Sequence, residues 1–329
     1  MTRVAVGGRL HFGFLNLSLA HERLYGSLGV ALDEPRTVVA AEPADAVRCD
    51  HDAGREYARR AVELLDVRGA DVTVERTLPR HVGLGSGTQL ALAVLAAVAC
   101  AHGREPRVRE RAPELGRGGR SGVGVATFSS GGFVLDAGHP TERFTADRPP
   151  EGEWSVPPVA ARHEVPDDWR FVVALPDAEP GRNGDAEDAS MRSVVERADP
   201  ALADEIATVV TRRVLPALAT DDHEAFGAAV AEVGRLNGAW YADQQGGVYR
   251  PPVGRVVSVL SDSAAIAGAG QSSWGPAVYG VTTADRAAAA REAAREALSA
   301  ADVGGEVLVA EPRNRGARIE SGVGGTLSG

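Results

Sequence analysis

Residues 79–102, PRHVGLGSGTQLALAVLAAVACAH, decide the fold, because a glycine loop runs directly into an apolar helix. Just before them, Val72, Val74 and Leu78 predict a strand. Residues 90–100 are almost wholly apolar and rich in alanine and leucine, so this helix is expected to be buried on most sides. The sequence therefore predicts a strand, a tight loop and a buried helix in succession.

The glycine loop is typical of an anion site. The candidate residues are Gly83, Gly85, Ser86, Gly87, Thr88 and Gln89. The first N–H groups of a helix lack partners within the helix, and its dipole adds partial positive charge, so the loop favours a bound phosphate. A turn that only lets strand and helix pack closely is the alternative. Three alternate glycines followed by hydroxyl side chains favour the phosphate interpretation.

Two well-known phosphate loops do not match. A Walker A loop needs a lysine after its last glycine, and this chain contains no lysine. The dinucleotide-binding pattern GxGxxG does not match either, because these glycines stand at alternate positions. The absence of lysine also excludes a lysine Schiff base or a lysine general base.

Length and composition indicate a globular protein of two domains. The chain has 329 residues, of which 44% are hydrophobic and 24% charged. It contains no apolar stretch long enough for a membrane span and no signal-peptide core, so a cytoplasmic location is expected. The net charge of −10 disfavours nucleic acid and anionic membranes as partners. Cys49 and Cys100 lack metal-ligand spacing and are expected to be free thiols.

Residues 1–40 alternate apolar runs with glycines and predict paired antiparallel strands, the second ending at Asp33 and Glu34. Simple alternation puts Leu10, Phe12 and Phe14 on one face and Arg9, His11 and Gly13 on the other. Arg9 and His11 therefore project together. The alternative is that these two side chains have no function and are either solvated or hydrogen-bonded to neighbouring groups. Residues 55–67 have apolar residues at helical spacing and predict a helix that covers the sheet.

A second glycine-rich stretch, residues 116–139, carries two arginines. Its first half is too rich in glycine for a stable helix, so Arg117, Arg120 and Ser121 are expected on a loop that can close around an anion. A mobile surface loop is the alternative. Residues 132–136 predict a strand, and the proline-rich residues 139–166 predict a boundary between domains 1–155 and 156–329.

The second domain is expected to be of α+β, ferredoxin-like type. The predicted order is a strand at 169–175, a polar loop at 176–191, helices at 199–215 and 221–239, a polar and aromatic cluster at 237–252, a glycine turn at 264–279, a helix at 284–300 and a strand at 306–310. The cluster is either a turn or the wall of an aromatic-ligand pocket. The glycine turn carries Gln271, Ser272, Ser273 and Trp274, which are expected across a cleft from the glycine loop.

The loop resembles the phosphate loop of the GHMP kinase superfamily, whose pattern is Pro, a few residues, then Gly-Leu-Gly-Ser-Ser. Pro79 and GLGSG match it, with Gly87 in place of the second serine. The resemblance implies a two-domain fold, with an N-terminal domain like domain 2 of ribosomal protein S5 and a ferredoxin-like C-terminal domain. Several of these kinases use an aspartate in Pro-Ser-Gly-Val-Asp, but RSGVG at residues 120–124 puts Gly124 there. The kinase carboxylate is therefore missing.

The details resemble a non-kinase branch, the β-ribofuranosylaminobenzene 5′-phosphate synthases. The matching segments are RLHFG at 9–13, YGSLGVALDEP at 25–35, GLGSGTQLALAV at 83–94, GRGGRSGVGVATFSSGGFVLDAGH at 116–139 and GQSSWGP at 270–276. This resemblance implies a pentosyltransferase that condenses phosphoribosyl pyrophosphate with 4-aminobenzoate or 4-hydroxybenzoate. CO₂ and pyrophosphate are released, Mg²⁺ assists, and the product enters methanopterin-type pterin biosynthesis.

Arg9, His11, Arg120 and Gln271 are the predicted catalytic residues. Gly83, Gly85, Ser86, Gly87, Thr88, Gln89, Ser121, Ser272, Ser273 and Trp274 are the predicted substrate-binding residues. Trp274 is expected to offer its indole face to the aromatic ring, with a domain-interface core residue as the alternative. Asp33 is a candidate Mg²⁺ ligand.

Two other functions stay open at this point. One is an ATP-dependent small-molecule kinase of the same superfamily, and the other is a non-catalytic nucleotide or anion sensor. The fold also suggests a homodimer.

Overall fold

The computed structural model describes residues 1–147, 149–179 and 184–321. Within them the larger sheet comprises β1 (Thr2–Asn16), β2 (Arg23–Pro43), β3 (Ala70–Arg76), β4 (Phe133–Asp136), β5 (His139–Pro140), β6 (Val159–His163) and β11 (Arg318–Ser321). Its strand order is β11-β1-β2-β4-β6, and β3 and β5 also pair with β2. β1 and β2 form the antiparallel pair that the sequence predicts.

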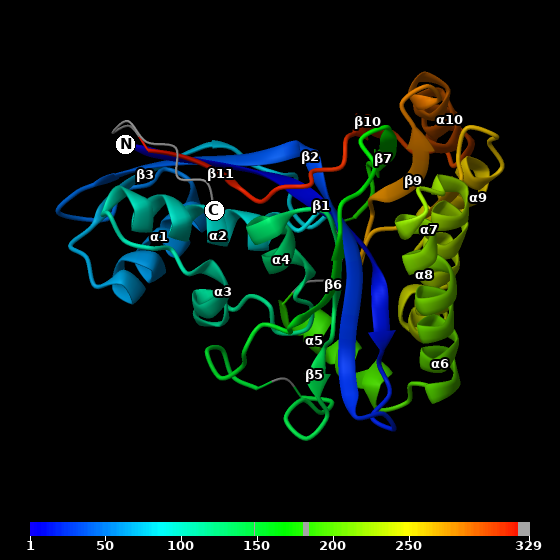
Figure 1. The fold of residues 1–329 in the computed structure, drawn as a ribbon, viewed down its shortest axis with the longest axis horizontal. Helices are drawn as coiled ribbons and strands as arrows, with labels where there is room; N and C mark the ends of the chain where they lie inside the picture. The colour runs from blue at the N-terminus through cyan, green and yellow to red at the C-terminus, as the bar shows by residue number, and fades with distance from the viewer. Residues whose placement is uncertain (148, 180–183, 322–329) are drawn as a thin grey trace.

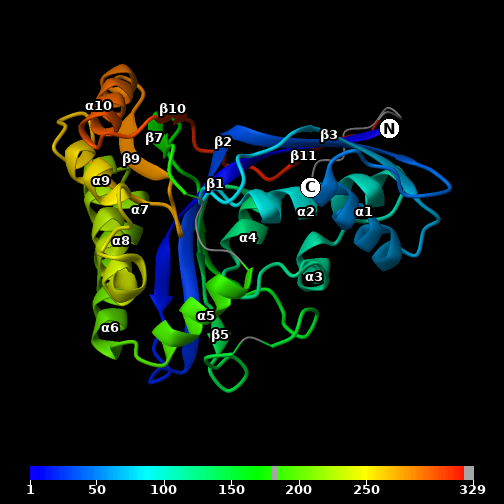
Figure 2. The same ribbon diagram turned by 180° about the vertical axis from the view of Figure 1, so that it is seen from behind.

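Four helices accompany this sheet: α1 (Asp52–Leu65), α2 (Ser86–Ala101), α3 (Val108–Arg111) and α4 (Val123–Ser130). Figures 1 and 2 place all four beside the long strands β1 and β2, on the side away from α6–α10. The buried helix after the glycine loop is confirmed, because every residue from 89 to 99 of α2 is buried. A short 3₁₀ turn, η1 (Pro113–Leu115), separates α3 from the second glycine-rich stretch.

The smaller sheet is built from β7 (Trp169–Pro176), β8 (Gly268–Gln271), β9 (Val278–Thr283) and β10 (Gly305–Ala310), in the antiparallel order β10-β7-β9-β8. Its helices are α5 (Gly184–Val195), α6 (Pro200–Val209), the π-helical η2 (Val210–Val214), α7 (Leu215–Ala219), α8 (His223–Gln245), α9 (Val253–Ser261) and α10 (Ala287–Ala300). Alternate residues of β7 belong to two different cores: Phe171 packs in the core with α8, and Val172 in the core with α9 and α10. Helices therefore cover both faces of this sheet.

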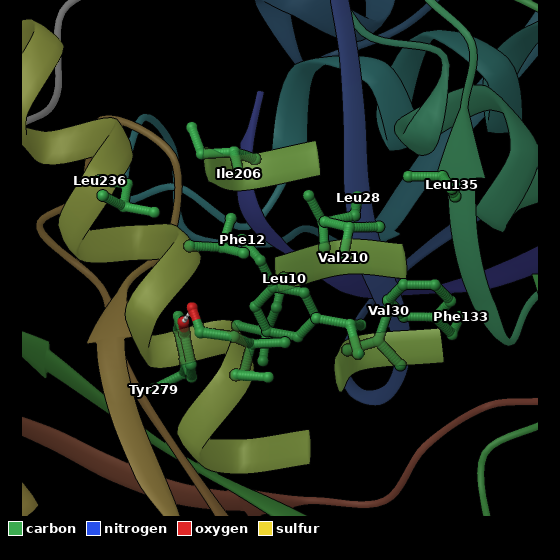
Figure 3. Close-up of a cluster of buried hydrophobic side chains, with 14 of the residues drawn as sticks. Leu10, Phe12, Leu28, Val30, Phe133, Leu135, Ile206, Val210, Leu236 and Tyr279 are labelled. Atoms are coloured by element: carbon green, nitrogen blue, oxygen red, sulfur yellow. Dashed lines mark hydrogen bonds between the residues drawn. The ribbon is translucent and has the colours of Figure 1, made fainter. Parts of the chain in front are cut away.

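The two sheets share one large apolar core, shown in Figure 3. Leu10 and Phe12 of β1 meet Ile206 of α6, Leu236 of α8 and Tyr279 of β9 in this cluster. The Phe12 ring packs edge-on against Tyr279 at a centroid distance of 5.0 Å. Since β1 also carries Arg9 and His11, this shared core fixes the position of those side chains relative to the smaller sheet.

Several predicted boundaries differ from the structure. β2 does not end at Asp33 and Glu34 but continues to Pro43. Its pairing with β1 is irregular around these residues, where the register shifts between Gly7 and Arg9 of β1. The glycine-rich stretch is a loop only as far as Gly122, after which α4 begins. Within the predicted polar loop, α5 begins at Gly184. α8 continues to Gln245, so most of the aromatic cluster lies on a helix.

The larger sheet also extends beyond residue 155. β6 pairs with β4, and β11 returns from the end of the described chain to pair with β1. The N-terminus and the last described strand consequently lie close together (Figure 1). No helix in the described part of the chain is long and apolar enough to span a membrane.

Candidate functional site

A cavity of about 600 Å³ lies at the start of α2. Its lining contains the glycine loop, the loop from Gly116 to Ser121, the β1 residues Arg9 and His11, and the turn from Ser273 to Gly275. Four segments far apart in the sequence are therefore brought together as the motifs predict.

The glycine loop has the conformation of an anion cradle. Gly83 and Gly85 both have positive φ, at 94° and 81°, and Gly85 is the N-cap of α2 with no side-chain cap. Gly83, Gly85, Ser86, Gly87 and Thr88 line the cavity. The open N–H groups of the first helical turn thus face the space where an anion would sit. Gln89 does not line the cavity: it is buried, and its Nε2 donates to the carbonyl of Gly124 at 3.0 Å.

Arg9 lies directly against this loop. Its backbone N–H donates to the carbonyl of Leu84 at 3.0 Å, and its guanidinium donates to the carbonyl of Gly83 at 2.6 Å. A side chain at position 85 would meet the stem of Arg9, since a Cβ there would lie 3.2 Å from Arg9 Cγ. Gly85 is therefore required both by its φ and by the approach of Arg9.

His11 lies beside Arg9 in the cavity wall, as alternation predicts, and is 4% exposed. Burial, reinforced by the nearby charge of Arg9, lowers the pKa of the imidazole to about 3. His11 is consequently neutral between pH 5 and 8 and does not titrate there. Its Nδ1 has no hydrogen-bond partner among the described residues, so the ring keeps a polar atom for a ligand.

Phe14 departs from the simple alternation. The pairing of β1 with β2 shifts between His11 and Gly13, which leaves Phe12 in the core and brings Phe14 to the cavity lining. Its ring packs edge-on against His11 at a centroid distance of 5.1 Å. The bulge therefore puts an aromatic ring beside the polar pair, which the sequence pattern alone does not indicate.

The turn after β8 does not lie across a cleft from the glycine loop; it is bonded to that loop. Ser272 is fully buried, its hydroxyl donates to the carbonyl of Gly83 at 2.7 Å, and it accepts from the N–H of His11 at 3.1 Å. The carbonyl of Val82 accepts from Ala277 at 3.0 Å. This close packing also excludes side chains at position 83, where a Cβ would lie 2.2 Å from the Ser272 carbonyl oxygen.

The other residues of this turn divide into two groups. Gln271 is used internally, because its Nε2 donates to the carbonyl of Ser273 at 2.9 Å and its Oε1 accepts from the N–H of Arg250 at 3.3 Å. Ser273 and Trp274 line the cavity. Trp274 is half-buried, packs on the core, and its ring centroid lies 4.7 Å from that of Tyr241. It therefore has features of both predicted roles, a core residue and a surface for an aromatic ligand.

The loop from Gly116 to Ser121 forms the opposite wall. Arg120 makes an ion pair with Asp188. Arg117 donates a hydrogen bond to the Tyr57 hydroxyl, and its guanidinium lies over the Tyr57 ring, 5.4 Å from the centroid. The sequence predicts this arginine on the loop but does not include it among the site residues. This arginine also approaches Gly87, whose Cβ would lie 3.3 Å from the Arg117 guanidinium. The loop therefore adds positive charge next to the start of α2.

Ser121 is held by a buried carboxylate. Its hydroxyl lies 2.6 Å from that of Ser27, which donates to Asp136 at 2.5 Å. Asp136 also accepts from the N–H groups of Gly122 and Gly138 at 2.8 and 3.0 Å. Burial outweighs these hydrogen bonds and raises the pKa of Asp136 to about 6. Asp136 thus anchors the start of α4 and, through Ser27, the orientation of Ser121.

Asp33 is not brought to the cavity. Its carboxylate pairs with Arg36 at 3.0 Å and with Arg313 at 3.2 Å, and it is absent from the cavity lining. The carboxylates that do line the cavity are those of Glu56, Glu151 and Asp188, of which Glu151 pairs with Arg60. Among the described residues, no group of three or more His, Cys, Asp or Glu side chains is arranged to hold a metal ion.

Chemically, the cavity is suited to a large anion. Arg9, Arg60, Arg80, Arg117 and Arg120 line it together with the start of α2, in a chain whose overall charge is −10. His11, Phe14 and Trp274 give one side a neutral, aromatic surface. A phosphorylated molecule and a flat ring can therefore be held side by side.

The comparisons with known proteins agree with this geometry. The model of the GHMP kinases N-terminal domain matches residues 55–132, and that of the GHMP kinases C-terminal domain matches residues 214–300. A protein of Methanothermobacter thermautotrophicus, β-ribofuranosylphenol 5′-phosphate synthase, is 35% identical, covering 94% of this chain and 95% of its own. A protein of Archaeoglobus fulgidus with the same name is 31% identical, covering 97% and 100%.

Among solved structures, the phosphomevalonate kinase of Streptococcus pneumoniae is similar in fold, with a TM-score of 0.69 at 13% identity. That match covers 94% of this chain and 99% of the kinase. The α+β, two-part GHMP fold that the glycine loop predicts is confirmed.

Proposed function

The chain belongs to the β-ribofuranosylphenol 5′-phosphate synthase family, and from this premise we propose that it joins the ribose 5-phosphate of phosphoribosyl pyrophosphate to 4-hydroxybenzoate, releasing CO₂ and pyrophosphate. The name of the relatives specifies a phenol. Of the two benzoates considered above, only 4-hydroxybenzoate gives a phenol product; 4-aminobenzoate would give an aniline. The reaction is a decarboxylating pentosyl transfer of methanopterin-type pterin biosynthesis.

The basic cavity at the start of α2 is the observation that carries this proposal. The donor carries three anionic phosphate groups, a 5-phosphate and a pyrophosphate, on one small sugar, and five arginines line the cavity. We assign the pyrophosphate to the glycine loop, where the helix N–H groups, Arg9 and Arg117 converge. Stabilising the departing anion lowers the barrier to breaking the anomeric C–O bond.

The bond changes balance without an added oxidant or reductant. The anomeric C–O bond to pyrophosphate breaks, and the ring carbon that bears the carboxylate forms the new C–C bond. The bond between that ring carbon and the carboxylate then breaks, its electron pair restores the aromatic ring, and CO₂ leaves. Holding the ring over the anomeric carbon supplies much of the acceleration, because both reactants are then correctly oriented.

Each side chain has a role that its surroundings allow. Arg9 stabilises the pyrophosphate charge. Neutral His11 offers a hydrogen bond at the junction of donor and acceptor. Ser121 and Arg120 contact the donor from the opposite wall, and Trp274 supports the ring. Gln271 acts as a positioning residue, since its amide is used within its own turn.

Mg²⁺ fits this site through the substrate. Mg²⁺ in nucleotide and polyphosphate sites is usually held by one or two carboxylates together with substrate phosphates. Three carboxylates line the cavity, and two of them are paired with arginines: Glu151 with Arg60 and Asp188 with Arg120. The third is Glu56, so the protein alone supplies an incomplete set of ligands for the metal ion. A magnesium ion carried by pyrophosphate, with Glu56 nearby, would neutralise part of the leaving-group charge.

The kinase alternative is disfavoured by the space at position 124. A Cβ at Gly124 would lie 3.1 Å from Thr88 Cγ2, which is tighter than ordinary contact, so Thr88 would have to shift by a few tenths of an ångström to admit the aspartate that several GHMP kinases carry there. Incubation with phosphoribosyl pyrophosphate, Mg²⁺ and 4-hydroxybenzoate should release pyrophosphate. Release of ADP from ATP with a small-molecule alcohol, and no pyrophosphate from the donor, would instead establish a kinase.

The homodimer and the cytoplasmic location remain predictions.

A further inference from the structure

A second, smaller cavity of about 50 Å³ opens beside the main one, between α8 and the turn after β8. Its walls are aromatic: Phe14 comes from β1, Tyr241 from α8, Tyr249 from the segment after α8, and Trp274 from the turn. Its floor is α8 itself, at Gly234 and Gly238. Figures 1 and 2 show α8 running alongside the lower part of β1 in both views.

The two floor glycines have different reasons to be glycine. At Gly238 a Cβ would lie 2.1 Å from the carbonyl oxygen of Val248, so backbone packing excludes any side chain. At Gly234 the nearest atoms to a Cβ are the hydroxyl oxygens of Tyr279 at 3.6 Å and Tyr249 at 3.7 Å, which is ordinary contact. A methyl group would therefore fit at 234, and glycine inside a helix costs about 1 kcal/mol relative to alanine. The protein keeps this space open at a cost in stability.

The small cavity is continuous with the main one. His11, Phe14, Ser273 and Trp274 line both of them. A cavity that encloses a benzene ring is on the order of 150 Å³, so 50 Å³ admits only one end of such a ring. The other end of a bound ring must therefore emerge at His11 and face the main cavity.

The inner end of the cavity offers one hydroxyl. Tyr249 lines this cavity and not the main one, and its hydroxyl oxygen lies 3.7 Å from the position of a Cβ at Gly234. Burial raises the pKa of Tyr249 to about 12, so the hydroxyl stays protonated and can donate. Two amide side chains of the cavity are already used: the Asn237 amide binds the backbone of Phe14 and Val233, and Gln245 Nε2 donates to Val248.

We propose that this cavity binds the 4-hydroxyl end of the aromatic acid, with Tyr249 donating a hydrogen bond to the 4-oxygen and the carboxylate-bearing carbon left at the mouth, facing the donor. The inference rests on the proposed function and deepens it. The orientation is the one that the reaction needs, because the carbon that bears the carboxylate must reach the anomeric carbon. It also predicts selectivity, since the nitrogen of 4-aminobenzoate shares its lone pair with the ring and is a poor acceptor.

Gly234→Ala tests the cavity, and Gly254→Ala is its matched control. Gly254 is also a helical glycine with room for a methyl group, 3.5 Å from Tyr249 Cβ, and it lines neither cavity. Gly234→Ala should melt no lower than the wild type, raise the KM for 4-hydroxybenzoate at least tenfold and change the KM for phosphoribosyl pyrophosphate less than twofold. Gly254→Ala should change neither constant. An unchanged KM for 4-hydroxybenzoate in folded Gly234→Ala would overturn the assignment.

Tyr249→Phe tests the orientation. It should reduce the preference for 4-hydroxybenzoate over 4-aminobenzoate, measured as the ratio of kcat/KM values, by about tenfold, as expected for one lost hydrogen bond. An unchanged ratio would show that the 4-substituent does not lie at Tyr249.

Failure of the proposed function would be seen separately, as a wild-type protein that forms no product from phosphoribosyl pyrophosphate. In that case, saturation-transfer NMR with 4-hydroxybenzoate would still decide the cavity assignment. Binding to wild type and Gly254→Ala but not to Gly234→Ala would support it, and equal binding to all three would overturn it.

Discussion

Ser272→Ala should weaken the junction between the glycine loop, β1 and the turn after β8. The hydroxyl that is removed is fully buried, donates to Gly83 at 2.7 Å and accepts from the N–H of His11 at 3.1 Å. The Gly83 carbonyl keeps the hydrogen bond from Arg9 at 2.6 Å, whereas the His11 N–H loses this acceptor. A buried donor without an acceptor costs about 1–3 kcal/mol.

This cost converts into a small but measurable shift. With an unfolding entropy of about 2.1 cal/mol/K per residue, 329 residues that unfold together lose roughly 1.5–4 °C of melting temperature for about 1–3 kcal/mol. Differential scanning calorimetry measures this shift. In kinetics, kcat/KM should fall by a similar factor for both substrates, because Ser272 holds the loop and His11 together. A normal melting temperature with a loss confined to one substrate would refute this reasoning, since the hydroxyl would then be a ligand group.

Three further outcomes are expected. Gly85→Ala should fold and raise the KM for phosphoribosyl pyrophosphate at least tenfold, because its φ of 81° is strained for alanine and its Cβ would push on Arg9; an unchanged KM in the folded variant would remove the loop from the donor site. Burial raises the pKa of Asp136 to about 6 in the folded protein, against an ordinary value of 3.8, so the stabilisation that its neutral form gives is fully present below about pH 4 and is lost as pH rises through 6. The free energy of unfolding of the wild type relative to Asp136→Asn should therefore fall by about 2–3 kcal/mol between pH 4 and 7, measured by urea titration. A difference that stays constant over this range would contradict the raised pKa. His11→Ala should lower kcat without removing any limb of the pH–rate profile between pH 5 and 8, because the imidazole is already neutral there; disappearance of a limb near pH 6.5 would show that it titrates in the working enzyme.

The local elements were predictable because local sequence determines them. The strand before the glycine loop and the buried helix after it follow from apolar patterning and from three alternate glycines. α4 escaped prediction because its glycines and β-branched residues are poor helix formers, and burial overrides that propensity. Gly124 shows the reason, since a Cβ at that position would lie 3.1 Å from Thr88.

The composition of the site was more predictable than its layout. The motifs brought Arg9, His11 and the glycine loop to one cavity. The place of Ser272 was not predictable, because its bond to Gly83 joins residues 189 positions apart. Phe14 reaches the cavity through a bulge, which reverses the alternation on which the sequence argument depends. Arg117 was expected on the anion-binding loop but not among the site residues, and the structure places it in the cavity lining.

Carboxyl-¹³C-labelled 4-hydroxybenzoate tests the central claim most directly. With phosphoribosyl pyrophosphate, Mg²⁺ and the protein, the label should leave entirely as ¹³CO₂, in an amount equal to the pyrophosphate released. The product should be an unlabelled phenol with a carbon–carbon bond to ribose 5-phosphate, visible by NMR. Label retained in a ribosylated benzoate, or pyrophosphate released without ¹³CO₂, would contradict the account.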